Sequence, residues 1–447
     1  MDKEYLIHQR PLQALLVFSL PMMIGNLFQQ FYTMVDSIVV GQFVSQDALA
    51  AVGASYSLTN VFISIAIGGG IGASVPTSRY FGARSYDCMK GSVQTALLSF
   101  LILSLLLAGI GLLCSRQILL LLNTPANIMD MATEYLNIYF LGLPFLFLYN
   151  VLSAMFNALG RSRIPLYLLI FSSLFNIALD LFLVLVFQMG VSGVAWATLI
   201  AQGISAVISF FLFLRELKRW SHTPQPLFQW RELRQMAGIA LPSILQQSTV
   251  SIGMMLVQSV VNSFGSEVLA GFSAGMRVES FVIVPMSAMG NAMSTFTAQN
   301  IGAGQLDRVP KGYHASMKIV IFFAILICLL LELGYRPIIQ LFLGEDGTAL
   351  AIHTGVSYLQ FMGWFFVLIG LKMISDGLLR GAGHMKPFTI ANLLNLLMRV
   401  VIAVTLAPLW GVQMVWYAVP IGWLLNFLIS FLAYRTGKWK TIALAKQ

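Results

Sequence analysis

Charged residues are scarce in this chain of 447 residues: Asp, Glu, Lys and Arg make up 10% of it, whereas hydrophobic residues make up 58%. Soluble domains usually carry about 25% charged residues, because charge covers the surface that faces water. The scarcity excludes a soluble enzyme, a disordered chain and a coiled coil. With a mean hydropathy of +0.82, the composition predicts an all-α polytopic membrane protein.

Cysteine and catalytic motifs are also scarce. The three cysteines, Cys88, Cys114 and Cys328, have no metal-ligand spacing, and their odd number excludes a fully paired disulfide framework. The sequence contains no HExxH motif, and its five histidines are scattered. We therefore expect neither an enzyme nor a bound cofactor.

Long apolar runs follow one another along the whole chain. Each is long enough to cross a bilayer, which takes about 20 mostly apolar residues. We predict twelve spans, near residues 12–41, 49–76, 91–114, 131–158, 164–189, 191–214, 236–263, 268–300, 313–335, 349–379, 387–409 and 411–434.

The basic residues are distributed unevenly between the predicted loops. If the N-terminus is cytoplasmic, 21 of the 26 Lys and Arg residues lie inside, only Arg116 and Arg336 lie outside, and three fall within spans. This asymmetry fits the positive-inside rule and predicts that both termini are cytoplasmic. It also explains the net charge of +9 without nucleic acid, since these side chains can face anionic lipid headgroups.

The two halves of the sequence resemble each other at an offset of about 220 residues. Leu20-Pro21 recurs as Leu241-Pro242, and Gly190-Val191 recurs as Gly411-Val412. The repeat predicts an amino-terminal six-helix bundle (1–215), a cytoplasmic linker (216–235) and a carboxy-terminal six-helix bundle (236–447). Because each repeat has an even number of spans, we expect a pseudo-two-fold axis along the membrane normal, as in transporters with parallel repeats.

Polar residues inside the first predicted span form one helical stripe. Asp36 is its only acid, and an acid at the centre of a spanning helix costs about 2.5–3.5 kcal/mol unless it faces a cavity or partner. The stripe also contains Asn26, Gln29, Tyr32 and Thr33.

The fifth and sixth spans add further oxygen-bearing side chains. Asn176 and Asp180 are four residues apart, as are Thr198 and Gln202, so each pair shares a helical face. Together with Asp36, these groups could bind a hard cation such as Na⁺ or hold a proton. A structural hydrogen-bond network is the alternative.

The second half does not repeat these acids, since Leu256 and Val257 stand where Asp36 would recur. Glu279 in the eighth span is its strongest acid candidate. Lys372, Asp376 and Arg380 follow at spacings of four and could neutralise one another. Substrate contact is equally open for these groups, and the seventh span offers Met254, Met255 and Gln258 as a wall suited to amphipathic ligands.

Several short motifs resemble the multidrug and toxic compound extrusion (MATE) family in order and spacing. They are the early Leu20-Pro21, residues 35–41 (VDSIVVG), residues 47–53 (DALAAVG), residues 157–160 (NALG) and residues 380–383 (RGAG). The resemblance covers essentially the whole chain. It implies an antiporter that exports organic cations and other amphipaths in exchange for inward H⁺ or Na⁺.

The same resemblance assigns residues to the site. Asp36, Asn176, Asp180 and Thr198 correspond to a cation-coupling site that would bind Na⁺ if the protein is sodium-coupled, and Tyr32 and Tyr135 would be its neighbours. We expect a monomer in a bacterial-type inner membrane, with small organic substrates and lipid as its partners. A flippase for a lipid-linked saccharide or another lipid is the alternative function, although it would favour a strongly cationic cleft.

Overall fold

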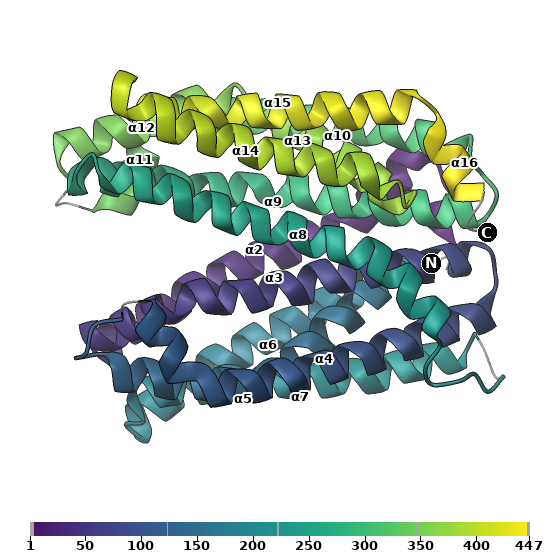
Figure 1. Ribbon diagram of the computed structural model, residues 1–447, viewed down its shortest axis with the longest axis horizontal. Helices are drawn as coiled ribbons and strands as arrows, with labels where there is room; N and C mark the ends of the chain where they lie inside the picture. The colour runs from purple at the N-terminus through teal and green to yellow at the C-terminus, as the bar shows by residue number, and fades with distance from the viewer. Residues whose placement is uncertain (1–3, 123, 221–222, 345–346, 445–447) are drawn as a thin grey trace. The chain divides into compact units, whose positions relative to one another are not determined.

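The computed structural model describes residues 4–122, 124–220, 223–344 and 347–444. These residues form helices and short connections, and none of them lies in a β-strand (Figure 1). The all-α fold class predicted from composition is confirmed.

Within the described residues, 11 helices are long and apolar enough to cross a membrane, and one bent pair makes a twelfth span. The pair is α12 (Ala349–Gly363) and α13 (Phe366–Gly381), which meet at 54°. The others are α2 (Pro11–Phe43), α3 (Gln46–Gly82), α4 (Tyr86–Leu121), α5 (Met129–Ala158), α6 (Arg163–Leu181) continued by the π-helix η1 (Phe182–Val186), α7 (Gly190–Lys218), α8 (Trp230–Asn262), α9 (Ser266–Gly302), α10 (Arg308–Glu332), α14 (Met385–Trp410) and α15 (Gln413–Arg435).

Three short helices were not expected from the sequence. They are α1 (Tyr5–His8), α11 (Tyr335–Leu343) and α16 (Lys438–Leu444). Helix α1 is fixed to other helices through its carbonyl groups: Asn300 donates to Leu6 O at 3.2 Å, and Arg308 donates to Gln9 O at 2.7 Å. The chain is therefore already ordered before the first span begins.

The repeat in the sequence is also visible in the backbone. Arg84 and Gly304, which lie 220 residues apart, follow the ends of α3 and α9 with φ angles of 57° and 72°. This left-handed conformation commonly ends a helix and is easiest for glycine. Gly190 and Gly411 likewise share positive φ angles, of 59° and 96°. The two halves thus turn their chains in the same way at equivalent positions, even where the side chain differs.

The chain forms two compact units whose boundaries lie inside helices. Unit 1 contains Met1–Met23 and Leu245–Gln447, and unit 2 contains Ile24–Ile244. Both changes of unit therefore occur within the first helix of a repeat, α2 or α8, shortly after Pro21 and Pro242. The first part of each of these helices therefore belongs to one unit, and the rest of the helix belongs to the other.

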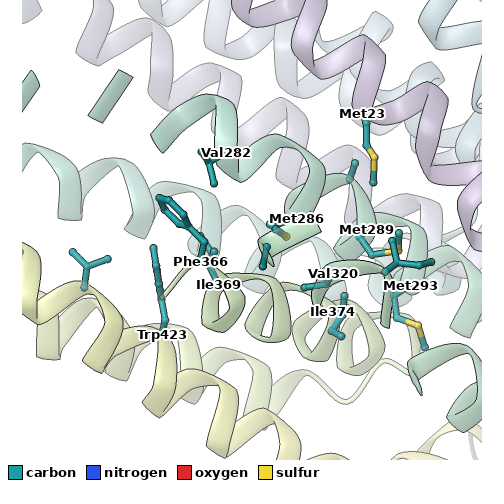
Figure 2. Close-up of a cluster of buried hydrophobic side chains, with 14 of the residues drawn as sticks. Met23, Val282, Met286, Met289, Met293, Val320, Phe366, Ile369, Ile374 and Trp423 are labelled. Carbon is teal, nitrogen blue, oxygen red and sulfur yellow. The ribbon is translucent and has the colours of Figure 1, made fainter. Parts of the chain in front are cut away.

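Burial explains why the start of α2 belongs to unit 1. Ala14, Leu15 and Phe18 are fully buried and share one hydrophobic cluster with residues of α9. Figure 2 shows part of this cluster, with Met23 of α2 and Met286, Met289 and Met293 of α9 among the labelled side chains.

The start of α8 belongs to unit 2 for a corresponding reason. Met236 belongs to a cluster built on α3, α4 and α5. A Cβ atom added at Gly68 or Gly72 of α3 would collide with the backbone of α8 at Ile244 or Ala240. These glycines therefore permit the close approach of the two helices.

Candidate functional site

The predicted coupling residues meet within unit 2. The site gathers Asp36 of α2, Asn176 and Asp180 of α6 and Thr198 of α7. Helical spacing places Asn176 and Asp180 on one face of α6, and both are almost completely buried, with exposed fractions of 2% and 0%. The fold thus brings together groups that are up to 162 residues apart in sequence.

Asp36 and Asp180 lie within hydrogen-bonding reach of each other. Two carboxyl groups so close in a dry site repel each other when both are ionised, so they favour holding a proton between them or binding a cation. The Oδ1 atom of each is buried and has no hydrogen-bond partner among the residues that the structure describes. Two acceptor positions are therefore left for an ion or a proton.

The amide of Asn176 connects Asp180 with Thr198. With its nitrogen turned toward Asp180, Asn176 donates to Asp180 Oδ2 at 2.9 Å, and its oxygen accepts from the Thr198 backbone N–H at 3.2 Å. The opposite orientation would face the amide oxygen with acceptors only. This bond fixes the second carboxyl group relative to α7.

Two tyrosines complete the site on its remaining sides. The Tyr32 hydroxyl group lies near Thr198, and both Tyr32 and Tyr135 interact electrostatically with Asp36 and Asp180. Their hydroxyl groups add oxygens that can act as donors or acceptors.

A small cavity adjoins these residues. It has a volume of about 20 Å³, enough for about one water molecule. Tyr135, Thr198 and Gln202 are among its lining residues. Gln202 thus lies beside the coupling residues on the same face of α7, as its spacing from Thr198 predicts. The cavity therefore has room for one water molecule or one small ion beside the site.

The oxygens of the site fit a hard monovalent cation or a proton. The set consists of two carboxyl groups, an amide, and three hydroxyl groups, which are the ligand types of a hard cation. Within the described residues, no group of three or more His, Cys, Asp or Glu side chains could hold a metal ion. Na⁺ binding here would therefore depend on the neutral oxygens as well as on the acids.

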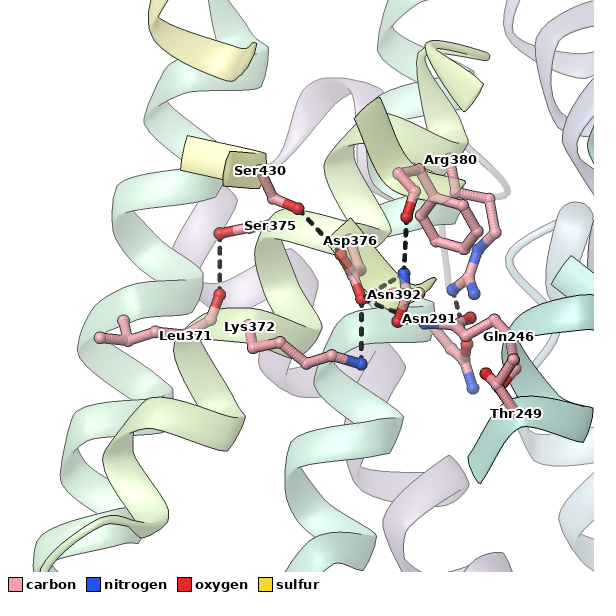
Figure 3. A network of polar contacts seen from close by, with 11 residues as sticks. Gln246, Thr249, Asn291, Leu371, Lys372, Ser375, Asp376, Arg380, Asn392 and Ser430 are labelled. Carbon is pink, nitrogen blue, oxygen red and sulfur yellow. Dashed lines mark hydrogen bonds and ion pairs between the residues drawn. The ribbon is translucent and has the colours of Figure 1, made fainter. Parts of the chain in front are cut away.

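Unit 1 contains a second buried carboxylate cluster, centred on Asp376 of α13 (Figure 3). Lys372 lies one turn earlier, and its Nζ is 3.1 Å from Asp376 Oδ2. Gln246 of α8 and Asn392 of α14 donate to the same oxygen at 3.1 and 3.2 Å, while Ser430 of α15 donates to Oδ1 at 3.1 Å. Both oxygens of this carboxylate are therefore satisfied by the protein itself.

The predicted pairing of Lys372 with Asp376 is confirmed, but Arg380 has other hydrogen-bond partners. It donates to Asn291 Oδ1 at 2.8 Å and to Ser294 Oγ at 3.3 Å, both on α9. Sequence spacing identified the local ion pair. It could not identify Gln246, Asn392 and Ser430, because those residues come from three other helices.

Glu279 has its own partners elsewhere in unit 1. It accepts a hydrogen bond from the Tyr358 hydroxyl group of α12, and Arg399 of α14 is a charged neighbour. Glu279 is 4% exposed, so it is part of a buried polar network.

Four other predicted substrate-contact residues are not among the described contacts of either carboxylate cluster. Gln29 is exposed on α2 in unit 2. Met254, Met255 and Gln258 lie on the part of α8 that belongs to unit 1, where the Met255 side chain is 53% exposed. Their role as a substrate wall stays a prediction.

Comparison with known proteins gives the family. The sequence matches the MatE family over residues 21–182 and 242–405, one block in each repeat, and the blocks together cover more than two thirds of the chain. The chain belongs to the MatE family. Its resemblance to multidrug and toxic compound extrusion proteins is therefore confirmed, and the match to both blocks agrees with the duplication.

Two relatives and one solved structure illustrate the range of this family. The chain is 29% identical over 435 residues to the probable multidrug resistance protein YpnP of Bacillus subtilis, covering 97% of each chain. It is 26% identical over 337 residues to an FAD transporter of Shewanella oneidensis, covering 74% of each. Its fold matches a multidrug resistance MATE family transporter with a TM-score of 0.91 at 23% identity, covering 99% of each chain.

Membership in this family makes the protein a multi-span membrane transporter. Its long apolar helices agree with this, and the relatives that are named for multidrug resistance belong to bacteria.

Proposed function

We propose that this MATE protein is a secondary antiporter that exports cationic or amphipathic organic compounds in exchange for inward H⁺ or Na⁺. The carboxyl pair of Asp36 and Asp180 supports this proposal most directly, because Asp180 is fully buried, Asp36 has one buried oxygen, and the pair lacks a fixed counter-cation among its described contacts. Asn176 and Thr198 assist in binding the coupling ion.

Competition for negative charge provides the coupling. A cationic substrate and the coupling ion both gain from the carboxyl pair, so occupancy by one weakens the binding of the other. Linkage requires the two effects on binding free energy to be equal. An ion entering from outside then promotes release of the substrate there, and release of the ion inside restores the empty carboxyl pair.

The orientation is part of the same proposal. The excess of Lys and Arg in alternate loops favours cytoplasmic termini. The proposal also includes the two expectations from the sequence that the protein contacts lipid and acts as a monomer. Export then follows from the direction of the ion gradient.

A substrate rich in negative charge is the competing possibility, since one relative is named as an FAD transporter and a lipid flippase would handle phosphate. The residues gathered at the unit 2 site carry two carboxyl groups and no basic side chain. Such a site would repel phosphate, so its charge favours an organic cation.

The test is transport in proteoliposomes with imposed Na⁺ or H⁺ gradients, using ethidium as the organic cation and FAD as the anionic alternative. We expect gradient-driven ethidium transport that Asp36→Asn reduces at least about tenfold, a change that corresponds to about 1.4 kcal/mol. The control is Asp130→Asn, which removes an acid that is exposed at the start of α5. Wild-type transport by Asp36→Asn, or transport of FAD alone, would refute the proposal.

A further inference from the structure

The cluster around Asp376 has the chemistry of a cation site, yet its charge is already balanced. A buried carboxylate surrounded by two side-chain amides and a hydroxyl group supplies oxygens of the kind that bind hard cations. Asp376 is 1% exposed and Lys372 is 3% exposed, and the Lys372 ammonium group is in direct contact with Asp376 Oδ2 at 3.1 Å.

We propose that unit 1 contains a latent site for a monovalent alkali cation and that the tethered ammonium group of Lys372 permanently occupies it. The ammonium group carries the same charge as Na⁺ or K⁺ but cannot leave. Asp376 would therefore take no free ion in the natural protein, and removal of the lysine charge would open the site to one.

The surrounding side chains can adapt to a free ion. Gln246 and Asn392 now turn amide nitrogens toward Asp376, and Gln246 also donates to Asn392 Oδ1 at 3.3 Å. A half-turn of the Gln246 amide exchanges nitrogen for oxygen at nearly unchanged shape, whereas the Asn392 amide is held in its present orientation because it also donates to Phe388 O at 2.8 Å. Ser430 Oγ donates its proton to Asp376 Oδ1 and still has lone pairs for a cation.

The backbone holds the carboxylate in place while these side chains turn. A Cβ atom at Gly377 or Gly381 of α13 would collide with the carbonyl oxygen of Gly290 or Ser294 of α9. Helices in such close backbone contact cannot shift easily, as in other small-residue interfaces of membrane proteins. A cation that replaced the ammonium group would thus find Asp376 already positioned.

The consequence for transport rests on the proposed function: only the carboxyl pair in unit 2 would exchange ions with the solution. The latent site itself does not depend on transport, because it can be detected by ion binding to the purified protein.

The experiment measures thermal unfolding of the detergent-purified chain in NaCl, KCl or choline chloride at equal ionic strength. The parent variant is Asp36→Asn/Asp180→Asn, in which any remaining ion response must come from outside the unit 2 pair. Adding Lys372→Met removes the ammonium group and keeps a flexible apolar side chain. The matched control adds Lys318→Met, which removes an exposed lysine of α10 instead.

We expect the Lys372→Met chain to gain at least about 2 °C in unfolding temperature with 200 mM Na⁺ or K⁺ relative to choline. The parent and the Lys318→Met control should show no such difference. An ion response already present in the parent would contradict the proposal, because it would mean that the lysine does not exclude a free ion. A folded Lys372→Met chain that responds to neither Na⁺ nor K⁺ would also contradict it.

Loss of folding would be informative as well. If Lys372→Met is recovered folded only in Na⁺ or K⁺, the ion has replaced the ammonium group, as proposed. The companion variant Lys372→Met/Asp376→Asn lacks both charges and should fold without an ion response. If only this companion folds, in every salt tested, no ion substitutes for the lysine and the proposal fails.

Discussion

The two buried carboxylate clusters differ in one respect that determines what each can do. Asp376 in unit 1 has a lysine, two amides and a hydroxyl group around it, and both of its oxygens have partners. Asp36 and Asp180 in unit 2 face each other, and each has one buried oxygen without a described partner. A carboxylate with a fixed counter-ion stabilises a fold, whereas a pair without one favours an exchangeable ion.

The clusters are also not copies of each other. At offsets of 220 and 221 residues, Asp376 corresponds to buried Phe156 and Met155, and Lys372 corresponds to buried Leu152 and Val151. The repeat therefore relates the helices of the two units but not the polar residues of these two clusters.

The largest effect should follow from breaking the fixed pair. Lys372→Met removes the ammonium group in contact with Asp376 and leaves Arg380 as a more distant positive neighbour, which should lower the free energy of unfolding by about 3–5 kcal/mol when alkali cations are absent. Thermal or denaturant unfolding in choline chloride measures this loss. If Lys372→Met/Asp376→Asn were equally unstable, the loss would come from packing and not from charge.

The corresponding change in unit 2 should spare stability and remove coupling. Asp180→Asn takes away one of two carboxyl groups that repel each other, so we expect unfolding within about 1 kcal/mol of wild type. Gradient-driven transport should fall at least about tenfold. A variant that loses stability and keeps its coupling would mean that Asp180, like Asp376, has a structural role.

A smaller effect is expected from a neutral oxygen of the site. Thr198→Val removes a hydroxyl group that lies near Tyr32, and the loss of one polar contact of this kind costs about 0.5–1.5 kcal/mol. The concentration of coupling ion needed for half-maximal transport should rise about two- to tenfold. An unchanged value would place the ion away from α7.

The smallest effect belongs to an exposed ion pair. Arg116 and Asp130 lie 3.1 Å apart, with side-chain exposures of 61% and 88%, and such pairs contribute little because water screens them. Arg116→Gln should leave both the unfolding temperature and gradient-driven transport unchanged within error. A strong effect on transport would show that charge outside the two clusters is important for coupling.

The sequence predicted much of this comparison, but not its decisive contacts. Apolar run length and the positions of basic residues were enough to find the spans, because the bilayer requires long apolar helices. Helical spacing also placed Asn176 beside Asp180 and Lys372 beside Asp376. Spacing of this kind works only along one helix.

The contacts between helices could not be read in the same way. Nothing in the chain near Asp376 indicates that Gln246 lies against it, since 130 residues separate them. The sequence also did not show that α2 and α8 are each divided between the two units. An apolar face indicates that a helix is buried, but it does not indicate which helices it packs against. The break between α12 and α13 contains Trp364 and Phe365 and no proline, so it had no local signal.

The central claim is that ions are exchanged at the unit 2 pair and not at the unit 1 cluster. The most direct test is ethidium transport by Asp36→Asn/Asp180→Asn in proteoliposomes, measured with and without an imposed Na⁺ or H⁺ gradient. We predict that ethidium still exchanges across the membrane when present on both sides, and that neither gradient drives its accumulation. Accumulation that still follows either gradient would contradict the account, because ions would then be coupled to transport without the unit 2 carboxyl pair.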